Sequence, residues 1–208
     1  MTDTAPALRP LPLFPLRAVL FPGGLLSLKV FEARYLDLVS TCLREQRGFG
    51  VVGLRKGGEV RMGAGEPVEF ETIGCEAELI EVNGDQPGIL QVRARGTERF
   101  QVHSYRQEAD GLWHAQVSEQ PADDALAPPA EMHGSVRSLM QAVASLQGQG
   151  IAPFLEPHRY DDAGWVANRW CELLPLSQEA RQRLMELPDA LVRLQLVDTF
   201  LRSKGVVG

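Results

Sequence analysis

Lysine and cysteine are scarce in this 208-residue chain, and long apolar runs are missing from it. Only three lysines occur, Lys29, Lys56 and Lys204, which leaves few candidate bases for a catalytic Ser–Lys pair. No apolar run approaches the roughly 20 residues that a membrane-spanning helix needs, so we expect no membrane segment. The first residues lack a basic start followed by an apolar stretch, so no secretory signal is readable and the cytoplasm is the expected location.

The three cysteines, Cys42, Cys75 and Cys171, lie far apart in the sequence. An odd number of widely spaced cysteines argues against a disulfide framework and against a zinc site built from paired cysteines. We expect three reduced thiols, mostly buried. The four histidines are His103, His114, His133 and His158. His103 and His114 have no second ligand at metal-binding spacing, and a solvated loop explains the polar residues around His158 better than a metal site does. The sequence therefore predicts neither a metal nor a cofactor.

The charge balance argues against nucleic acid as a partner. Lysine and arginine total 21 and aspartate and glutamate total 27, so the formal net charge is −6. The basic residues are scattered, whereas nucleic-acid binders usually concentrate them on one face. Hydrophobic residues make up 44% and charged residues 23%, which is ordinary for a globular protein with a substantial core.

The first part of the chain has the residue pattern of a β-rich subdomain. Residues 1–10 are rich in proline and alanine and are expected to be frayed. Residues 11–120 carry several short alternating runs, such as 26–30, separated by turn residues. One amphipathic helix is expected over 32–45, and Asn83-Gly84-Asp85 is typical of a hairpin turn. Prolines in the first apolar run are expected to mark strand ends, edges or bends.

The second part of the chain has helical periodicity. Residues 121–131 contain three prolines and small polar residues, which favours a linker. Apolar residues then recur at helical spacing over 132–208, with Ser177 as a helix N-cap. The pattern as a whole predicts an α+β chain, with a β-barrel or sandwich subdomain over 11–120 and a helical subdomain over 132–208.

Several segments resemble the amino-terminal, substrate-binding domain family of Lon proteases. The sequences LPLFPLR at 11–17, FPG at 21–23 and LKVFEARY at 28–35 closely resemble the opening of that domain. The segments IGCEA at 73–77 and GTERF at 96–100 are similar to later strands of the family. The helical end is similar to the bundle that closes the domain, so the resemblance spans nearly the whole chain.

The resemblance implies a fold and a role. The fold would be a PUA-like, partly open β-barrel followed by a C-terminal helical bundle. The role would be to engage polypeptide substrates, here as a free-standing bacterial version of the domain. Most residues that carry the resemblance are expected to be structural, and they are Phe14, Pro15, Phe21, Pro22, Gly23, Phe31, Glu32, Tyr35, Gly74, Gly96, Arg99 and Phe100. The aromatic members are expected in the core.

The chemical parts of a Lon protease have no counterpart in this sequence. No G-x-x-x-x-G-K-[ST] loop occurs, and the nearest string, Lys56-Gly57-Gly58, lacks both the spacing and the Ser/Thr for magnesium. No Gly-x-Ser-x-Gly elbow occurs, and Ser27, Ser40 and Ser177 lie in structural contexts. An unrecognised hydrolase is thus the weakest hypothesis, and we expect no catalytic residue.

The leading hypothesis is a non-catalytic polypeptide-recognition module that acts as an adaptor or weak holdase for a protein client. Candidate contacts are Trp113, beside a hairpin turn, and Trp165 and Trp170, of which one is expected in the core and the other exposed. Arg34 is expected to pair with Glu32 or with barrel carbonyls, and is also a candidate for a peptide carboxylate. The alternative is a PUA-like small-ligand or RNA-binding module. The sequence indicates no oligomeric state.

Overall fold

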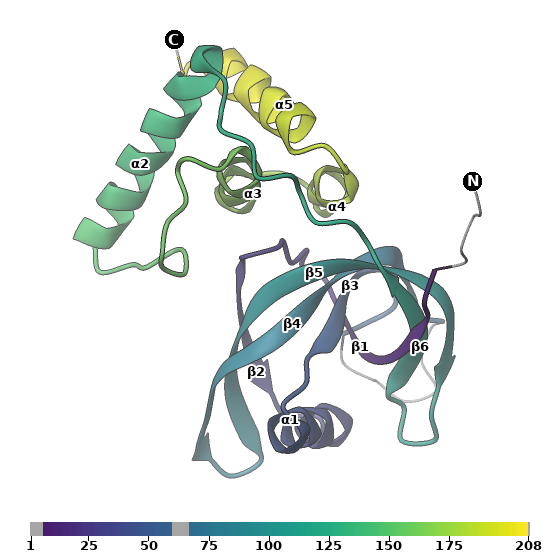
Figure 1. Cartoon of the computed structure of the whole chain (residues 1–208). Helices are drawn as coiled ribbons and strands as arrows, with labels where there is room; N and C mark the ends of the chain where they lie inside the picture. The colour runs from purple at the N-terminus through teal and green to yellow at the C-terminus, as the bar shows by residue number, and fades with distance from the viewer. Residues whose placement is uncertain (1–5, 60–66, 208) are drawn as a thin grey trace. The chain divides into compact units, whose positions relative to one another are not determined.

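The computed structural model describes residues 6–59 and 67–207, and the chain divides into two compact units (Figure 1). The first, which we call the sheet unit, ends at Gln120, and the second, the helical unit, begins at Pro121. The chain is therefore of mixed α+β class. Among the described helices, none is both long enough and apolar enough to span a membrane.

The sheet unit is built on one curved, six-stranded sheet. Its described elements are β1 (Arg9–Leu16), β2 (Leu25–Val30), α1 (Ala33–Glu45), β3 (Phe49–Lys56), β4 (Glu69–Gln86), β5 (Ile89–Gln107) and β6 (Trp113–Glu119). The strand order is β2-β5-β4-β3-β1-β6, with a further pairing of β5 with β6. Only β1 and β3 run parallel; the other described pairs are antiparallel.

The long strand β5 makes the sheet curve back on itself. On one edge β5 pairs with β4. On the other edge it pairs with β2 over Leu90–Arg95 and with β6 over Phe100–Gln107. Strand β6 thus returns to pair with the second half of β5, while the first half of the same edge of β5 pairs with β2. The result is a curved sheet and not a closed barrel.

The prolines of β1 lie inside the strand, where the sequence predicted ends, edges or bends. Pro10 and Pro12 pair with β6 but not with β3, because the pairing of β1 with β3 begins only at Leu13. Pro15 is paired with β3 beyond the point where the β6 ladder ends. Each proline thus has one side without a partner strand, and a missing N–H on that side would break no ladder bond.

Two glycines make room for the ring of Phe100 in the sheet core. A Cβ added at Gly50 would lie 2.7 Å from Cζ of Phe100, and one added at Gly74 would lie 2.6 Å from the same atom. Real Cβ atoms do not approach other atoms so closely, so the ring occupies the space of the missing side chains. Phe100 is 1% exposed. The Gly74 and Phe100 of the sequence motifs are therefore one packing unit.

Two other motif segments, far apart in the sequence, lie against each other. The Gly23 N–H donates to the Gly96 carbonyl at 2.7 Å, and the Gly96 N–H donates to the Gly24 carbonyl at 2.9 Å. Gly23 has a φ of 72°, which favours glycine. A Cβ at Gly96 would collide with the carbonyl oxygen of Phe21. The sequence predicted a break at Gly96, yet β5 continues through it.

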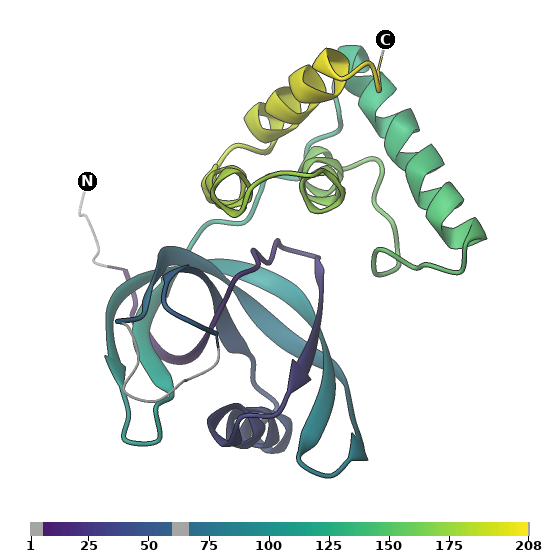
Figure 2. The same cartoon turned by 180° about the vertical axis from the view of Figure 1, so that it is seen from behind.

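Helix α1 lies beside the sheet in both views and packs on its core (Figures 1 and 2). The rings of Tyr35 and Phe14 stack with centroids 3.7 Å apart. Arg34 pairs with Glu32 at 3.0 Å, as the sequence predicted. Phe31 was expected in the core, and this expectation is wrong, because its side chain is 52% exposed. Val30 before it points into the core, and alternation along the chain turns Phe31 outward.

The hairpin between β4 and β5 turns later than the sequence predicted. Asn83 lies within β4 and pairs with Gln91. The turn is formed by Pro87 and Gly88, between the paired residues Gln86 and Ile89. Gly88 has a φ of 76° and supplies the left-handed conformation that this two-residue turn requires.

The helical unit contains four α-helices and one 3₁₀ helix among its described residues. These are η1 (Ala130–Met132), α2 (His133–Gly148), α3 (Ala163–Leu173), α4 (Gln178–Glu186) and α5 (Ala190–Ser203). Ser177 accepts a hydrogen bond from Ala180 N–H at 3.2 Å, so the predicted N-cap is confirmed. Asp162 and Asp189 cap α3 and α5 in the same way.

A buried arginine holds the segment before these helices. Arg193 of α5 is 1% exposed and binds both carboxylate oxygens of Asp123, at 2.6 and 3.1 Å. It also donates to the Leu184 carbonyl at 2.8 Å and to the Leu187 carbonyl. The segment that the sequence presented as a linker is therefore fixed to the helical unit, because Asp123 belongs to it.

The three thiols are buried and free, as the sequence predicted. Burial raises the pKa of Cys42 to about 11 and that of Cys171 to about 12. Only the thiolate reacts with a disulfide reagent. We expect no thiol to react with Ellman's reagent at pH 8 in the native protein and all three to react in guanidinium chloride. A fast native reaction, read from the released thionitrobenzoate, would contradict the buried placement.

Candidate functional site

Three aromatic side chains form a cluster in the sheet unit, and we call Phe70, Tyr105 and Trp113 the aromatic cluster. The ring centroids of Phe70 and Tyr105 lie 4.7 Å apart, those of Phe70 and Trp113 lie 5.5 Å apart, and those of Tyr105 and Trp113 lie 5.6 Å apart. The distances and the tilted or edge-on geometry are those of favourable aromatic pairs. Each ring thus fixes the other two in a defined surface.

The cluster combines a buried base with an exposed rim. Phe70, near the start of β4, is 7% exposed, and Trp113, at the start of β6, is half-buried. Tyr105, near the end of β5, is 51% exposed. Trp113 pairs across the sheet with Leu13 of β1 and Gln107 of β5, so regular strands hold its backbone. A rigid aromatic surface of this kind binds apolar side chains at little cost in entropy.

The other two tryptophans lie in the helical unit and are both buried. Trp165 is 8% exposed and Trp170 is 5% exposed. Trp170 donates its indole N–H to the Ser135 carbonyl at 3.0 Å. The expectation that one of the pair is exposed is therefore wrong, because α3 is covered on nearly all sides. The spacing of the two tryptophans could not reveal this burial, because a spacing of five residues is compatible both with a fully buried helix and with an amphipathic one.

Arg34 is held by the fold of the sheet unit. Its guanidinium lies over the Tyr35 ring at 4.5 Å, and it donates to the Gly111 carbonyl at 2.9 Å. The guanidinium also pairs with the Glu32 carboxylate at 3.0 Å, and the side chain of Arg34 is only 9% exposed. The arrangement matches the structural role that the sequence favoured for it.

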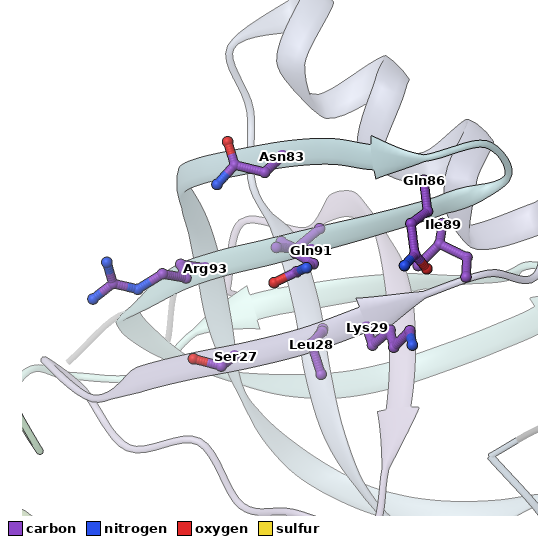
Figure 3. Close-up of a pocket in the computed structure, with 9 residues that line it drawn as sticks. Ser27, Leu28, Lys29, Asn83, Gln86, Ile89, Gln91 and Arg93 are labelled. Carbon is purple, nitrogen blue, oxygen red and sulfur yellow. The ribbon is translucent and has the colours of Figure 1, made fainter. Parts of the chain in front are cut away.

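A polar groove lies over β2, β5 and the end of β4 (Figure 3). Its volume is about 480 Å³. Its lining residues are Ser27, Leu28, Lys29, Asn83, Gln86, Ile89, Gln91, Val92 and Arg93. Sequence reasoning missed this groove, because the three strands that form it are brought together only by the sheet order. The alternation over 26–30, which turns Ser27 and Lys29 to the face opposite the core, was the one available signal.

The two cations of the groove differ in their surroundings. Arg93 pairs with the Glu81 carboxylate at 3.1 Å. Hydrogen bonds from Asn83 and from Arg93 lower the pKa of Glu81, so this carboxylate stays ionised and neutralises Arg93. Lys29 is exposed and forms no ion pair with any residue in the described ranges. The groove therefore presents one unneutralised positive charge.

A serine and a histidine also meet on the sheet, and this pair was not anticipated. Nε2 of His103 lies 2.8 Å from Oγ of Ser118. The register between β5 and β6 shifts between Val102 and Ser104, which places His103 at the irregularity. Within the described residues no carboxylate is hydrogen-bonded to the other ring nitrogen, so the third member of a catalytic triad is missing.

The described residues hold no metal site: no three His, Cys, Asp or Glu side chains converge in the ranges 6–59 and 67–207. Two surfaces thus stand out among the described residues, the aromatic cluster and the polar groove. The first is aromatic, and the second is polar and contains Lys29.

Comparison with known proteins decides the family. Residues 10–203 match the model of the ATP-dependent protease La (LON) substrate-binding domain. This chain belongs to that family. A crystal structure titled as a Lon N-terminal domain protein from Xanthomonas campestris superposes with a TM-score of 0.71 at 32% identity, and the match covers 91% of this chain and 96% of that one. The N-terminal domain of a Mycobacterium avium complex Lon protease shares the fold, with a TM-score of 0.60 at 16% identity over 91% of this chain and 96% of that chain.

The Lon proteases that match are much longer than this chain. Lon protease of Anaeromyxobacter dehalogenans is 26% identical over 93% of this chain, which spans 23% of that protein. Lon protease 2 of Myxococcus xanthus is also 26% identical over 93% of this chain, which spans 24% of its length. The match thus concerns the substrate-binding domain, and the activity of the whole protease is not carried over. The resemblance seen in the sequence motifs is confirmed.

Proposed function

We propose that this Lon substrate-binding domain recognises non-native polypeptide segments and acts as an adaptor or weak holdase, without covalent chemistry, in the cytoplasm. The observation that carries the proposal is the match of residues 10–203 to the Lon substrate-binding domain. The curved sheet of the sheet unit would then be a variant of the PUA-like, partly open barrel. The aromatic cluster supplies a chemically suitable surface.

The chemistry of the aromatic cluster fits apolar side chains that only an unfolded client exposes. Tyr105 and Trp113 offer ring faces and edges together with a polar hydroxyl and indole N–H, which suits mixed apolar and backbone contacts. The rings are already ordered by contact with Phe70, so little conformational entropy is lost on binding. Of the candidates from the sequence, Trp113 is the one we retain as a client contact.

The absence of covalent chemistry belongs to the same proposal. The sequence contains no nucleotide-binding loop of the G-x-x-x-x-G-K-[ST] form. The Ser118–His103 pair has no orienting carboxylate among the described hydrogen bonds, and such a carboxylate is what holds a catalytic imidazole in the productive tautomer. Recognition alone is thus what the described surfaces support.

Replacing Tyr105 with alanine is expected to weaken client binding by about five- to tenfold, which is the usual size of one exposed aromatic contact. The measurement is fluorescence anisotropy of a labelled protein that is kept unfolded by reduction and alkylation of its cysteines. The same protein in its native form serves as the folded control. The wild-type chain is expected to bind the unfolded form selectively.

A matched control is Leu196→Ala in the helical unit. Leu196 and Tyr105 are both 51% exposed, so both changes remove a large exposed side chain. Equal losses for the two variants would show that the aromatic cluster has no special part in binding. No binding of the unfolded protein by the wild type would overturn the proposal as a whole. Tight, salt-sensitive binding of RNA in low salt would replace it with the RNA-binding alternative.

A further inference from the structure

Strand β2 presents an open edge. It stands at the end of the strand order and pairs with β5 alone in the part of the chain that the structure describes (Figure 1). Over Leu25–Val30 it is regular, with an unbroken register and no proline. Proteins usually protect such edges with prolines, bulges, very short strands or charged side chains, and of these β2 carries only the charge of Lys29.

The register shows which backbone groups point away from the sheet. The Gly96 N–H donates to the Gly24 carbonyl at 2.9 Å, which puts Gly24 in the bonded set of this antiparallel pair. Bonded and non-bonded positions alternate, so the even-numbered residues of β2 bond to β5. The N–H and C=O groups of Leu25, Ser27 and Lys29 therefore face the open edge. An extended segment laid beside β2 would find a full set of donors and acceptors.

The polar groove adjoins this edge and adds a charge preference. Ser27 and Lys29 project on the groove side of β2, next to Gln91 and Arg93 of β5 (Figure 3). Side chains of an added strand would alternate between this side and the other. Those on the groove side would meet Lys29, whose charge is not neutralised within the described ranges, whereas Arg93 is already paired with Glu81. An acidic side chain fits there, and a basic one does not.

We propose that the open edge of β2 binds an extended client segment by strand addition, with an acidic side chain of the client beside Lys29. This inference rests on the proposed function and names the backbone site through which it works. Main-chain hydrogen bonds would give affinity for many sequences, and Lys29 would give the preference. The aromatic cluster would bind apolar side chains separately.

The test uses labelled peptides of about seven residues, an ordinary strand length, and fluorescence anisotropy. The parent peptide alternates valine and glutamate. One variant has lysine in place of glutamate, and another carries N-methyl groups on alternate residues, which removes the donors of one peptide edge. The protein variants are Ser27→Pro, which removes an outward N–H, and Ser27→Ala, which keeps it. Circular dichroism checks that each variant is folded.

The parent peptide is expected to bind, and N-methylation and Ser27→Pro are each expected to lower its affinity at least ~tenfold, the loss of about one well-made hydrogen-bonded contact. Ser27→Ala, which keeps the backbone N–H, and Leu196→Ala, which lies outside both proposed surfaces, are expected to bind it as the wild type does. Lys29→Glu is expected to reverse the preference toward the lysine peptide. The N-methylated peptide tests the proposal in the unaltered protein, even if Ser27→Pro does not fold.

Equal affinity for the parent and the N-methylated peptide would overturn strand addition. If the wild type still binds the unfolded protein in that case, only this inference fails and the proposed function stands. A dimer in sedimentation velocity that Ser27→Pro dissociates would assign the edge to a second copy of the chain, which also overturns the proposal.

Discussion

Replacing Arg193 with methionine is expected to lower the free energy of unfolding of the helical unit by about 3–5 kcal/mol. The reason is the number of groups that this guanidinium satisfies. It binds both oxygens of Asp123, the side-chain oxygen of Asn168 at 3.1 Å, and two carbonyls, and its side chain is 1% exposed. Methionine fills a similar volume but removes the guanidinium that contacts both oxygens of the Asp123 carboxylate, which is 15% exposed.

The measurement is urea unfolding followed by circular dichroism, with Arg183→Met as the control. Arg183 is an exposed residue of α4, so the same chemical change there is expected to cost less than about 0.5 kcal/mol. A double variant that also carries Asp123→Asn is expected to recover part of the loss, because it removes the buried negative charge that Arg193 would otherwise balance. Equal stability of the Arg193 and Arg183 variants would show that the buried pair contributes nothing.

Replacing Gly96 with alanine is expected to destabilise the sheet unit by about 3 kcal/mol, at the upper end of the usual cost of overpacking. The added methyl group would meet the Phe21 carbonyl oxygen and would lie 3.0 Å from Cγ of Leu20. The first of these atoms is backbone, so it cannot rotate away. Moving it would also break the hydrogen bonds that join Gly96 to Gly23 and Gly24.

Gly84→Ala is the matched control for this change in the same sheet. A Cβ at Gly84 would find only Cδ2 of Leu90, at 3.4 Å, which is ordinary contact. We expect this variant to be as stable as the wild type or slightly more so, because alanine restricts the unfolded chain. Thermal unfolding of the two variants side by side measures the difference. If Gly96→Ala unfolds at the same temperature as the wild type, the segments around Gly23 and Gly96 can move apart without a cost in stability.

The order of secondary structure could be predicted from the sequence because it depends on local periodicity. The alternation over 26–30 and the helical spacing over 32–45 correspond to β2 and α1. The turn of the long hairpin was misplaced, because Asn83-Gly84-Asp85 is a strong local signal, while the register of β4 against β5 selects Pro87-Gly88 instead. The pairing of two long strands therefore determines the position of the turn more strongly than the local turn residues do.

The candidate site was harder to predict because its parts come from different strands. Trp113 was visible as a tryptophan beside a turn, but the contacts that Phe70 of β4 and Tyr105 of β5 make with it depend on how the strands pair and fold together. The open edge of β2 depends on the strand order, which no local pattern encodes. Conversely, Trp165 and Trp170 carried the same residue type as Trp113 and proved to be core, since residue type alone does not fix exposure.

The ion pair between Asp123 and Arg193 also decides where the chain can be divided for separate study of its two units. A helical fragment that starts at residue 132 would lack the only carboxylate that Arg193 contacts among the described residues, and would carry a buried cation without a counter-ion. A fragment that starts at Pro121 keeps the pair intact, and it also keeps the hydrogen bond from Ala163 N–H to the Leu126 carbonyl. The cut that preserves both halves therefore lies at Gln120, ahead of the proline-rich segment.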